Sequence, residues 1–114
     1  MSAGHVLPPA GSQKILAGEW LAGERPGELV RPLIDDPAGY RTMLLRVVPG
    51  PLGELHAHDM IEQIYVLEGD LYDDEASYGP GDFVVRMPGA THRAGSQGGC
   101  TMMVVYVPLV SRTA

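Results

Sequence analysis

Apolar residues in this chain come in short runs, and glycine, proline and aspartate separate one run from the next. The clearest runs cover residues 40–48, 63–67, 83–87 and 100–107. Runs of this length between turn residues are typical of β-strands, and no stretch carries the longer period of an amphipathic helix. The run 40–48 (Y-R-T-M-L-L-R-V-V) is apolar on both strand faces, which predicts burial on both sides.

Weaker patterns fill the intervals between these strands. Short strands are expected at 29–31, 56–58 and 71–72, and residues 15–21 fit either one helical turn or a short strand. Residues 73–77 are predicted to form a hairpin tip with a solvated acidic face. Turn residues predict breaks at 35–39, 49–53, 68–69, 79–82, 88–89 and 95–99. About eight to ten short strands at regular spacing predict an all-β fold, an antiparallel double-sheet jelly roll or barrel.

Length and composition fit one globular domain. The chain has 114 residues, of which 45% are hydrophobic, so it can bury a single core without disulfides. We expect a barrel domain over residues 14–110, between a flexible N-terminal arm (1–13) and a loose C-terminal tail (111–114). Trp20, the only tryptophan, is expected to cover one end of the core.

Charge and cysteine content exclude several classes of function. The formal charge is −6 and Lys14 is the only lysine, so nucleic acid and anionic membrane are not expected as partners. No apolar run approaches the roughly 20 residues that span a bilayer, and the N-terminus has no signal-peptide pattern, so we expect a cytoplasmic protein. Cys100 is the only cysteine and is expected to be a small buried hydrophobic residue rather than a nucleophile.

Metal-binding side chains gather within residues 50–69. His56, His58 and Glu62 lie within seven residues of one another. Residues two apart on an extended strand project from the same face, so both imidazoles could reach one ion. Such N and O donors bind Zn²⁺, Fe²⁺, Mn²⁺ or Ni²⁺. A His-x-His pair alone is equally consistent with half-exposed strand histidines; His92, on a later strand, is the candidate fourth donor.

The spacing around these residues resembles the two motifs of the cupin superfamily. The first motif, G-x5-H-x-H-x3,4-E-x6-G, is matched at every fixed position over residues 50–69. The second motif, G-x5-P-x-G-x2-H-x3-N, is matched over residues 81–92 except that Met87 stands where the family prefers proline. Ser96 also stands where the motif has asparagine. Neither departure falls on a metal ligand, so both concern the shape of the loops.

This resemblance implies a jelly-roll β-barrel that holds one divalent metal ion per chain through His56, His58, Glu62 and His92. Glu62 could instead be a weak ligand or a base beside three histidines. The strings E-Q-I-Y-V-L-E-G-D-L-Y-D-D and Y-G-P-G-D-F-V-V-R-M-P-G-A-T-H-R look like the cupin branch of zinc-binding anti-sigma-factor domains and β-diketone-cleaving dioxygenases. Anti-sigma proteins carry a helical sigma-binding domain ahead of the cupin. No such domain is seen in this sequence, so we expect another role.

Two functions follow from the resemblance. The first is a non-haem Fe(II) dioxygenase, or a metal-dependent isomerase or lyase, acting on a small enolisable or aromatic compound. The alternative is a non-catalytic sensor or ligand-binding module with a structural zinc site. An open coordination position is typical of a catalytic metal, whereas four protein donors on Zn²⁺ are typical of a structural one.

Candidates for the wall of a substrate pocket are polar or bulky residues on the strands near the ligands. For each of them, packing or a surface position is the more common role. Arg46 interrupts an apolar strand and, if buried, would need a partner such as a substrate carboxylate or enolate. The candidates are Arg46, Gln63, Tyr65, Tyr72, Arg86, Met102 and Tyr106.

A homodimer is the expected assembly, because cupins are often dimers. The apolar run 100–107 could serve as a sheet edge that pairs with a second copy across a two-fold axis.

Overall fold

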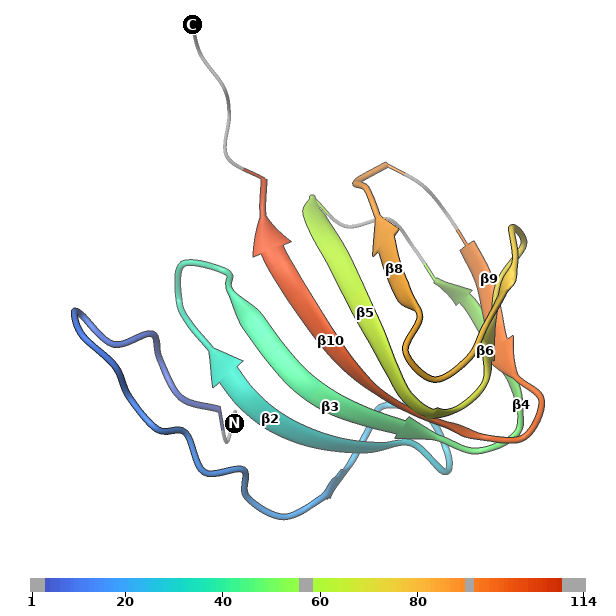
Figure 1. Cartoon of the computed structure of the whole chain (residues 1–114), viewed down its shortest axis with the longest axis horizontal. Helices are drawn as coiled ribbons and strands as arrows, with labels where there is room; N and C mark the ends of the chain where they lie inside the picture. The colour runs from blue at the N-terminus through green and yellow to red at the C-terminus, as the bar shows by residue number, and fades with distance from the viewer. Residues whose placement is uncertain (1–3, 56–58, 90–91, 110–114) are drawn as a thin grey trace, which may run out of the picture.

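The computed structural model describes residues 4–55, 59–89 and 92–109. Within these ranges the chain forms ten β-strands and no helix (Figure 1). The strands are β1 (Leu21–Ala22), β2 (Leu29–Asp35), β3 (Arg41–Val47), β4 (Gly50–Leu55), β5 (Met60–Gly69), β6 (Leu71–Tyr72), β7 (Ser77–Tyr78), β8 (Phe83–Arg86), β9 (His92–Ser96) and β10 (Cys100–Pro108).

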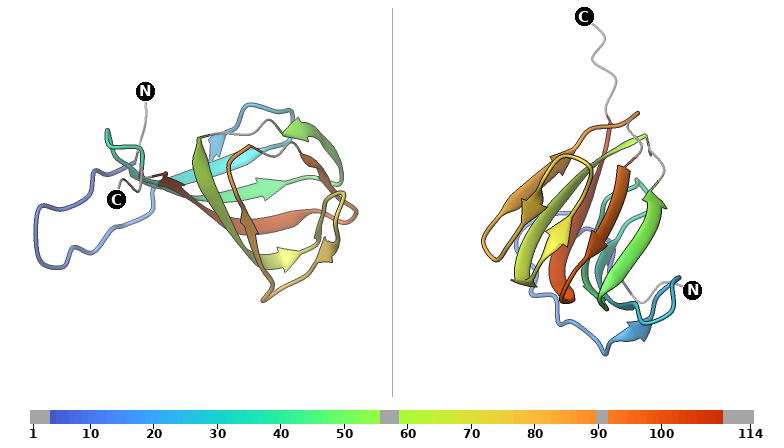
Figure 2. Two further views of the ribbon diagram at one scale, coloured as in Figure 1. Left: turned by 90° about the horizontal axis from the view of Figure 1, so that it is seen from above. Right: turned by 90° about the vertical axis from the view of Figure 1, so that its right-hand side faces the viewer.

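The strands form two antiparallel sheets. The larger sheet has the order β1-β2-β3-β10-β5-β8 and the smaller one has the order β4-β9-β6-β7. The sheets curve toward each other around a common interior, and the far ends of β2, β3 and β10 extend beyond it toward the N-terminal arm (Figure 2). This arrangement confirms the predicted all-β, jelly-roll-like fold.

The core lies between the two sheets and is built by alternation along each strand. On β5, Ile64 and Val66 are buried, whereas Tyr65 and Leu67 face outward. Cys100 is buried in the same cluster, as predicted. The buried members of the cluster are Val47, Ile64, Val66, Leu71, Val84, Cys100, Met102 and Val104.

Several predicted element boundaries need correction. Residues 49–53 were expected to be a turn, yet β4 already begins at Gly50, and a register shift between Pro51 and Gly53 accommodates the turn-forming residues within the strand. The strands β2, β5 and β9 are likewise longer than predicted, because pairing with β3, β10 and β4 extends them, in β5 and β9 to include Gly69 and Gly95. Residues 15–20 contain no regular element. The strand expected at 56–58 lies outside the described residues.

The run at 40–48 was predicted to be buried on both faces, and this is wrong. Val47 of β3 is buried, but Arg46 and Val48 are exposed, because only one face of the larger sheet meets the smaller sheet. The suggestion that residues 100–107 form a sheet edge is also wrong. Strand β10 lies inside the larger sheet, where β3 pairs with one side of it and β5 with the other.

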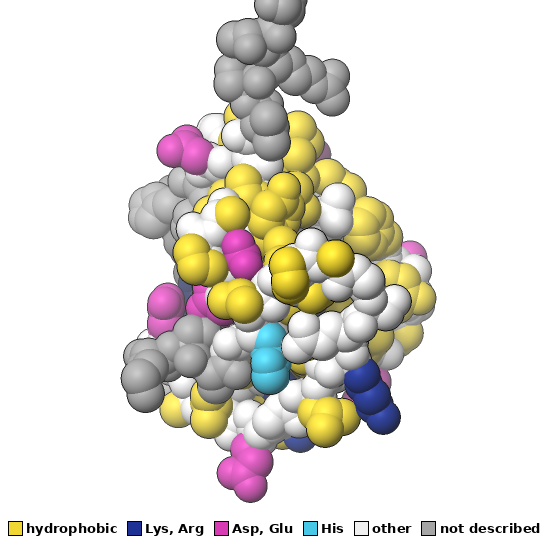
Figure 3. Space-filling model, turned by 90° about the vertical axis from the view of Figure 1, so that its left-hand side faces the viewer, with side chains coloured by type: hydrophobic (Ala, Val, Ile, Leu, Met, Phe, Trp, Pro, Cys, Tyr) yellow, Lys and Arg dark blue, Asp and Glu magenta, His cyan; other side chains and the backbone are white. Residues whose placement is uncertain are grey.

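The N-terminal segment runs along the outside of the larger sheet. His5 forms a parallel bridge with Ile34, and Trp20 stacks between Arg31 and Arg46, whose guanidinium carbons lie 4.9 and 4.4 Å from the ring centroid. Trp20 therefore covers two arginines rather than one end of the core. Apolar side chains make up much of the molecular surface on the side of this arm (Figure 3). None of the described residues belongs to a helix long and apolar enough to cross a membrane.

Candidate metal centre

Two of the four predicted ligand positions, Glu62 and His92, belong to strands that start at the same end of the barrel (Figure 1). Strand β4 ends at Leu55, the residue before His56, and Leu55 pairs with His92 at the start of β9. Glu62 stands near the start of β5, and the starts of β5 and β9 lie at the upper end of the barrel together with the ends of β4 and β8 (Figure 1). His56 and His58 lie outside the described residues.

Glu62 is the centre of a row of three polar residues across neighbouring strands. The register pairs it with Tyr106 of β10 on one side and with Arg86 of β8 on the other. Directly opposite residues of antiparallel strands share a face at roughly 5 Å, which brings these three side chains into contact. Arg86 Nη1 lies 2.9 Å from Glu62 Oε1, and the Tyr106 phenol forms a hydrogen bond with the same carboxylate.

The second half of the Arg86 guanidinium is held by Asp73. Nη2 lies 2.9 Å from Asp73 Oδ2, and the side chains of Arg86 and Asp73 are only 7% and 2% exposed. Asp73 also accepts hydrogen bonds from the Tyr78 hydroxyl and from the backbone amides of Glu75 and Ala76. The expectation that residues 73–77 form a purely solvated acidic tip is therefore wrong for Asp73, because its carboxylate neutralises a buried arginine.

One donor of Arg86 is left over. Its Nε–H is buried and has no acceptor within the part of the chain that the structure describes. Buried polar groups are nearly always hydrogen-bonded in native proteins, so this N–H calls for an acceptor that the described residues do not supply.

Burial and charge shift the pKa values in this network in opposite directions. Burial, reinforced by the charge of Glu62 and its hydrogen bond, raises the pKa of Tyr106 far above its usual range. Burial would also raise the pKa of Asp73, but hydrogen bonds from Arg86, Glu75, Ala76 and Tyr78 outweigh it and lower that pKa. Tyr106 therefore stays a neutral phenol and Asp73 an ionised carboxylate at neutral pH.

The structure divides the predicted pocket residues between the two faces of the sheets. Met102 and Arg86 are buried, and Tyr106 packs against the core cluster. Gln63 and Tyr65 lie on the outer face, since Ile64 between them takes the core position. Tyr72 faces outward as well, because its neighbour Leu71 is the buried residue of β6.

Arg46 does not point into the barrel, so the condition under which it was expected to need a substrate carboxylate or enolate, burial, is not met. It is exposed, its Nε lies 3.3 Å from Thr101 Oγ1, and its guanidinium stacks on Trp20. The reason is strand parity: Val47 and Leu45 on either side of it face the core. Its charge is balanced by solvent and by the Trp20 ring rather than by a buried partner.

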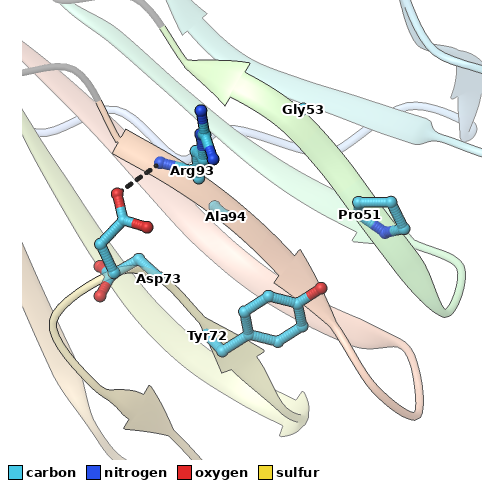
Figure 4. A pocket seen from close by; sticks show the side chains of 7 residues that line it. Pro51, Gly53, Tyr72, Asp73, Arg93 and Ala94 are labelled. Carbon is cyan, nitrogen blue, oxygen red and sulfur yellow. Dashed lines mark hydrogen bonds between the residues drawn. The ribbon is translucent and has the colours of Figure 1, made fainter.

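A separate groove lies on the outer face of the smaller sheet. It has a volume of about 380 Å³ and lies between β4, β6 and β9 (Figure 4). Tyr72 crosses Gly95 closely enough that a Cβ atom at Gly95 would overlap its hydroxyl. The lining residues are Pro51, Gly53, Tyr72, Asp73, Asp74, Arg93 and Ala94. The Arg93 backbone amide donates to Asp74 at this groove. Asp73 also lines the groove, and it is the lining residue that joins the Glu62 network through Arg86.

A divalent metal fits the part of the site that can be described. No cluster of three metal-binding side chains occurs within residues 4–55, 59–89 and 92–109, so Glu62 is the donor whose geometry can be tested. Its carboxylate has about four lone-pair positions, and Arg86 and Tyr106 use two of them, which leaves room for a metal. Borderline divalent ions accept such an oxygen donor alongside imidazoles.

Asp73 and Tyr78 are members of this network that the sequence did not single out. Asp73 belongs to an acidic run at a hairpin tip, where carboxylates are normally solvated. The sequence of β8 did hint at such a partner. Alternation from Phe83 to Arg86 places Arg86 on the same face as the buried Val84, and a buried arginine requires an acidic partner.

The sequence also matches a known protein family. A model of the family described as the ChrR cupin-like domain matches residues 12–110 of the chain. The chain belongs to this cupin family. No curated protein matches it. The match covers both cupin motifs and all four predicted ligand positions.

Solved structures show the same fold at low sequence identity. An RmlC-like cupin protein from Ralstonia eutropha has a TM-score of 0.70 at 18% identity, over 79% of this cupin and 63% of that chain. The Rhodobacter sphaeroides complex of SigE with the anti-sigma ChrR has a TM-score of 0.65 at 20% identity, with 78% and 49% covered. Fe(II) HppE has a TM-score of 0.67 at 17% identity, with 88% and 66% covered. The chain therefore spans about half to two thirds of these proteins.

Proposed function

We propose that this cupin is a metal-dependent enzyme that binds one divalent ion, with Fe²⁺ favoured, and acts as a dioxygenase on a small enolisable or aromatic compound. The observation that carries the proposal is the inward-facing Glu62 carboxylate at the barrel end where Leu55 and His92 pair. The cupin family match and the structural likeness to an Fe(II) protein support the choice of metal.

The ligands in this proposal are His56, His58, Glu62 and His92, with Zn²⁺, Mn²⁺ or Ni²⁺ as other ions that such donors accept. When bound, the ion supplies Lewis acidity toward substrate oxygens and, as iron, the redox chemistry of oxygenation. The chain itself supplies a neutral phenol at Tyr106 and a dry apolar wall that includes Met102 and Val104. The same site could serve an isomerase or lyase.

Arg86 supports a substrate that carries an oxygen acceptor. Its Nε–H has no acceptor among the described residues and would donate to a carbonyl or hydroxyl oxygen of the substrate. Two carboxylates already contact this one guanidinium, so the network carries a net negative charge. A neutral oxygen is therefore a better match for this donor than a third carboxylate would be.

Metal analysis tests the site. Protein purified without chelators should contain close to one metal ion per chain, and replacing both His56 and His58 by alanine should abolish binding. Because imidazole must be neutral to ligate, the ion should be released as the pH falls below about 6. A metal-free wild-type protein, or an alanine variant that still binds, would contradict the ligand set.

Oxygen uptake separates the two functional classes. Protein loaded with Fe(II) should consume oxygen with β-diketones, flavonols or hydroxyaryl ketones in an oxygen-electrode screen. The His56→Ala variant is the control for uncatalysed uptake. Normal metal content without uptake or turnover of any such compound would favour the alternative, a ligand-binding or sensing cupin with a structural metal.

A further inference from the structure

The inference concerns Arg86 and Asp73, and it rests on the proposed metal site. Arg86 holds one oxygen of Glu62 and is itself held by Asp73, with both contacts at 2.9 Å. Neither residue belongs to the predicted ligand set. Both are almost fully enclosed, so their orientations are set by packing and not by solvent.

The anchoring continues beyond Asp73. Oδ1 of Asp73 accepts hydrogen bonds from the backbone amides of Glu75 and Ala76, at 2.9 and 3.0 Å, and from the Tyr78 hydroxyl. The hairpin between β6 and β7 thus holds the Asp73 carboxylate in place. Asp73 in turn orients the Arg86 guanidinium, and Arg86 orients the Glu62 carboxylate. On the other side of Glu62, Tyr106 holds the same carboxylate from β10.

Charge explains why Asp73 is needed. A Glu62–Arg86 pair alone would be neutral, and its guanidinium would repel a divalent cation in this enclosed space. With Asp73 the network has two carboxylates and one guanidinium, so one net negative charge remains to favour a cation. The arginine can then orient Glu62 without cancelling the attraction of the site for metal.

We propose that Arg86 and Asp73 are positioning residues for metal binding: Asp73 holds and neutralises Arg86, and Arg86 sets the orientation in which Glu62 presents its carboxylate to the ion. Partners of metal ligands of this kind alter metal affinity by about 10- to 100-fold when removed. Both residues therefore act on the metal through Glu62, although neither contacts it.

The test measures Co²⁺ affinity and the visible Co²⁺ spectrum of the metal-free full chain. Arg86→Lys and Asp73→Asn should each weaken Co²⁺ binding at least about tenfold and shift the spectrum, while binding remains one ion per folded chain. Two matched controls come from the outer groove. Asp74→Asn and Arg93→Lys change the same residue types on the far side of the smaller sheet and should leave affinity and spectrum unchanged.

A double-mutant cycle with Glu62→Gln shows whether Arg86 influences metal affinity through Glu62 or independently of it. If Arg86 acts through Glu62, adding Arg86→Lys to Glu62→Gln should cause no further loss of affinity. Independent, additive losses would overturn the inference, as would wild-type affinity in both Arg86→Lys and Asp73→Asn. If only one of these variants folds, the Co²⁺ affinity of that variant decides.

A wild-type protein that binds no Co²⁺ would overturn the metal site itself, whereas wild-type binding with unaffected variants would overturn only the positioning roles.

Discussion

At the scale of single residues, the ion pairs around Arg86 are the most consequential contacts of the molecule. A buried ion pair gains little net stability over an apolar replacement, but removing one partner leaves a charge without compensation. Asp73 is 2% exposed. Losing its carboxylate would leave the charge of Arg86 balanced by Glu62, but it would remove the acceptor of the buried Arg86 Nη2 donor. Glu62, at 17% exposure, is better hydrated.

We predict that Asp73→Ala destabilises the fold by about 1–3 kcal/mol, because Arg86 Nη2 and the Tyr78 hydroxyl lose their acceptor in an enclosed site. Urea unfolding at neutral pH measures this. Asp74→Ala is the matched control, since Asp74 is exposed and should change stability by less than about 0.5 kcal/mol. Equal stabilities of the two variants would contradict a structural role for the Asp73–Arg86 pair.

The titration of the Asp73 carboxylate should make the stability of the fold depend on pH. The pKa of Asp73 is lowered in the folded chain, because hydrogen bonds from Arg86 and the backbone outweigh burial. Its stabilising effect is therefore complete above the ordinary aspartate pKa of about 4 and is lost as pH falls through the lowered value. The Asp73→Asn variant lacks this titration, so the stability gap between wild type and variant should shrink between about pH 5 and pH 2, from about one unit above to about two units below that ordinary value. A gap that stays constant over this range would contradict the assignment.

At the scale of elements, the crossing from the larger to the smaller sheet depends on the contact between two turns. Gly69 ends β5 with φ +80°, and a Cβ atom there would overlap the Gly99 carbonyl oxygen. The Asp70 amide donates to the same carbonyl at 3.1 Å. The Asp70 carboxylate accepts from Ser96 Oγ at 3.2 Å and from two backbone amides of the β9–β10 turn. Ser96, which departs from the family motif, thus still ties the two turns together.

We predict that Gly69→Ala lowers stability by about 2 kcal/mol or more, since the new methyl group must both displace the Gly99 carbonyl and accept a left-handed backbone conformation. Thermal unfolding followed by circular dichroism measures the change. Gly79→Ala is the control: Gly79 has no positive φ and an added Cβ would meet no atom within 4 Å. A Gly69→Ala melting temperature equal to that of Gly79→Ala would contradict the steric argument.

At the scale of the whole molecule, the outer face of the larger sheet is unusually apolar at the β5–β8 end. Phe83 and Val85 of β8 are 56% and 50% exposed, and Phe83 pairs with Tyr65 of β5, which is 40% exposed. Leu67 extends the same outward row. The four side chains of this patch are uncharged, although exposed Glu68 and Asp82 border it, so two copies can pack these apolar side chains together without burying like charges.

We propose that a second copy of the chain covers this face across a two-fold axis, with β8 at the end of the sheet order among the described strands. Light scattering coupled to size exclusion should find a dimer. Phe83→Glu should weaken that dimer by about 2 kcal/mol or more, because it buries a charge in an apolar interface. Leu16→Glu, which alters a leucine that is even more exposed (70%) and lies before β1, should leave the dimer intact. A monomeric wild type, or a dimer unaffected by Phe83→Glu, would contradict this interface.

Much of the fold could be predicted from local pattern. Short apolar runs between turn residues predicted the strands at 40–48, 83–87 and 100–107, and the turn residues at 79–82 lie where the structure has a turn. The pattern also predicted Cys100 as a buried residue. The predicted ligand positions His56 and His58 remain predictions, since they lie outside the described residues.

The sequence by itself determined which residues can alternate, where the chain can turn and which donors are available, because these properties depend on neighbours a few positions away. Only the tertiary structure decided which face of each strand meets the core. Arg46 and Arg86 occupy similar positions on apolar strands, yet Arg46 lies outside on Trp20 and Arg86 lies inside between Glu62 and Asp73. The physical reason is that alternation separates two faces without saying which one a second sheet will cover, and that choice depends on contacts between strands distant in the chain.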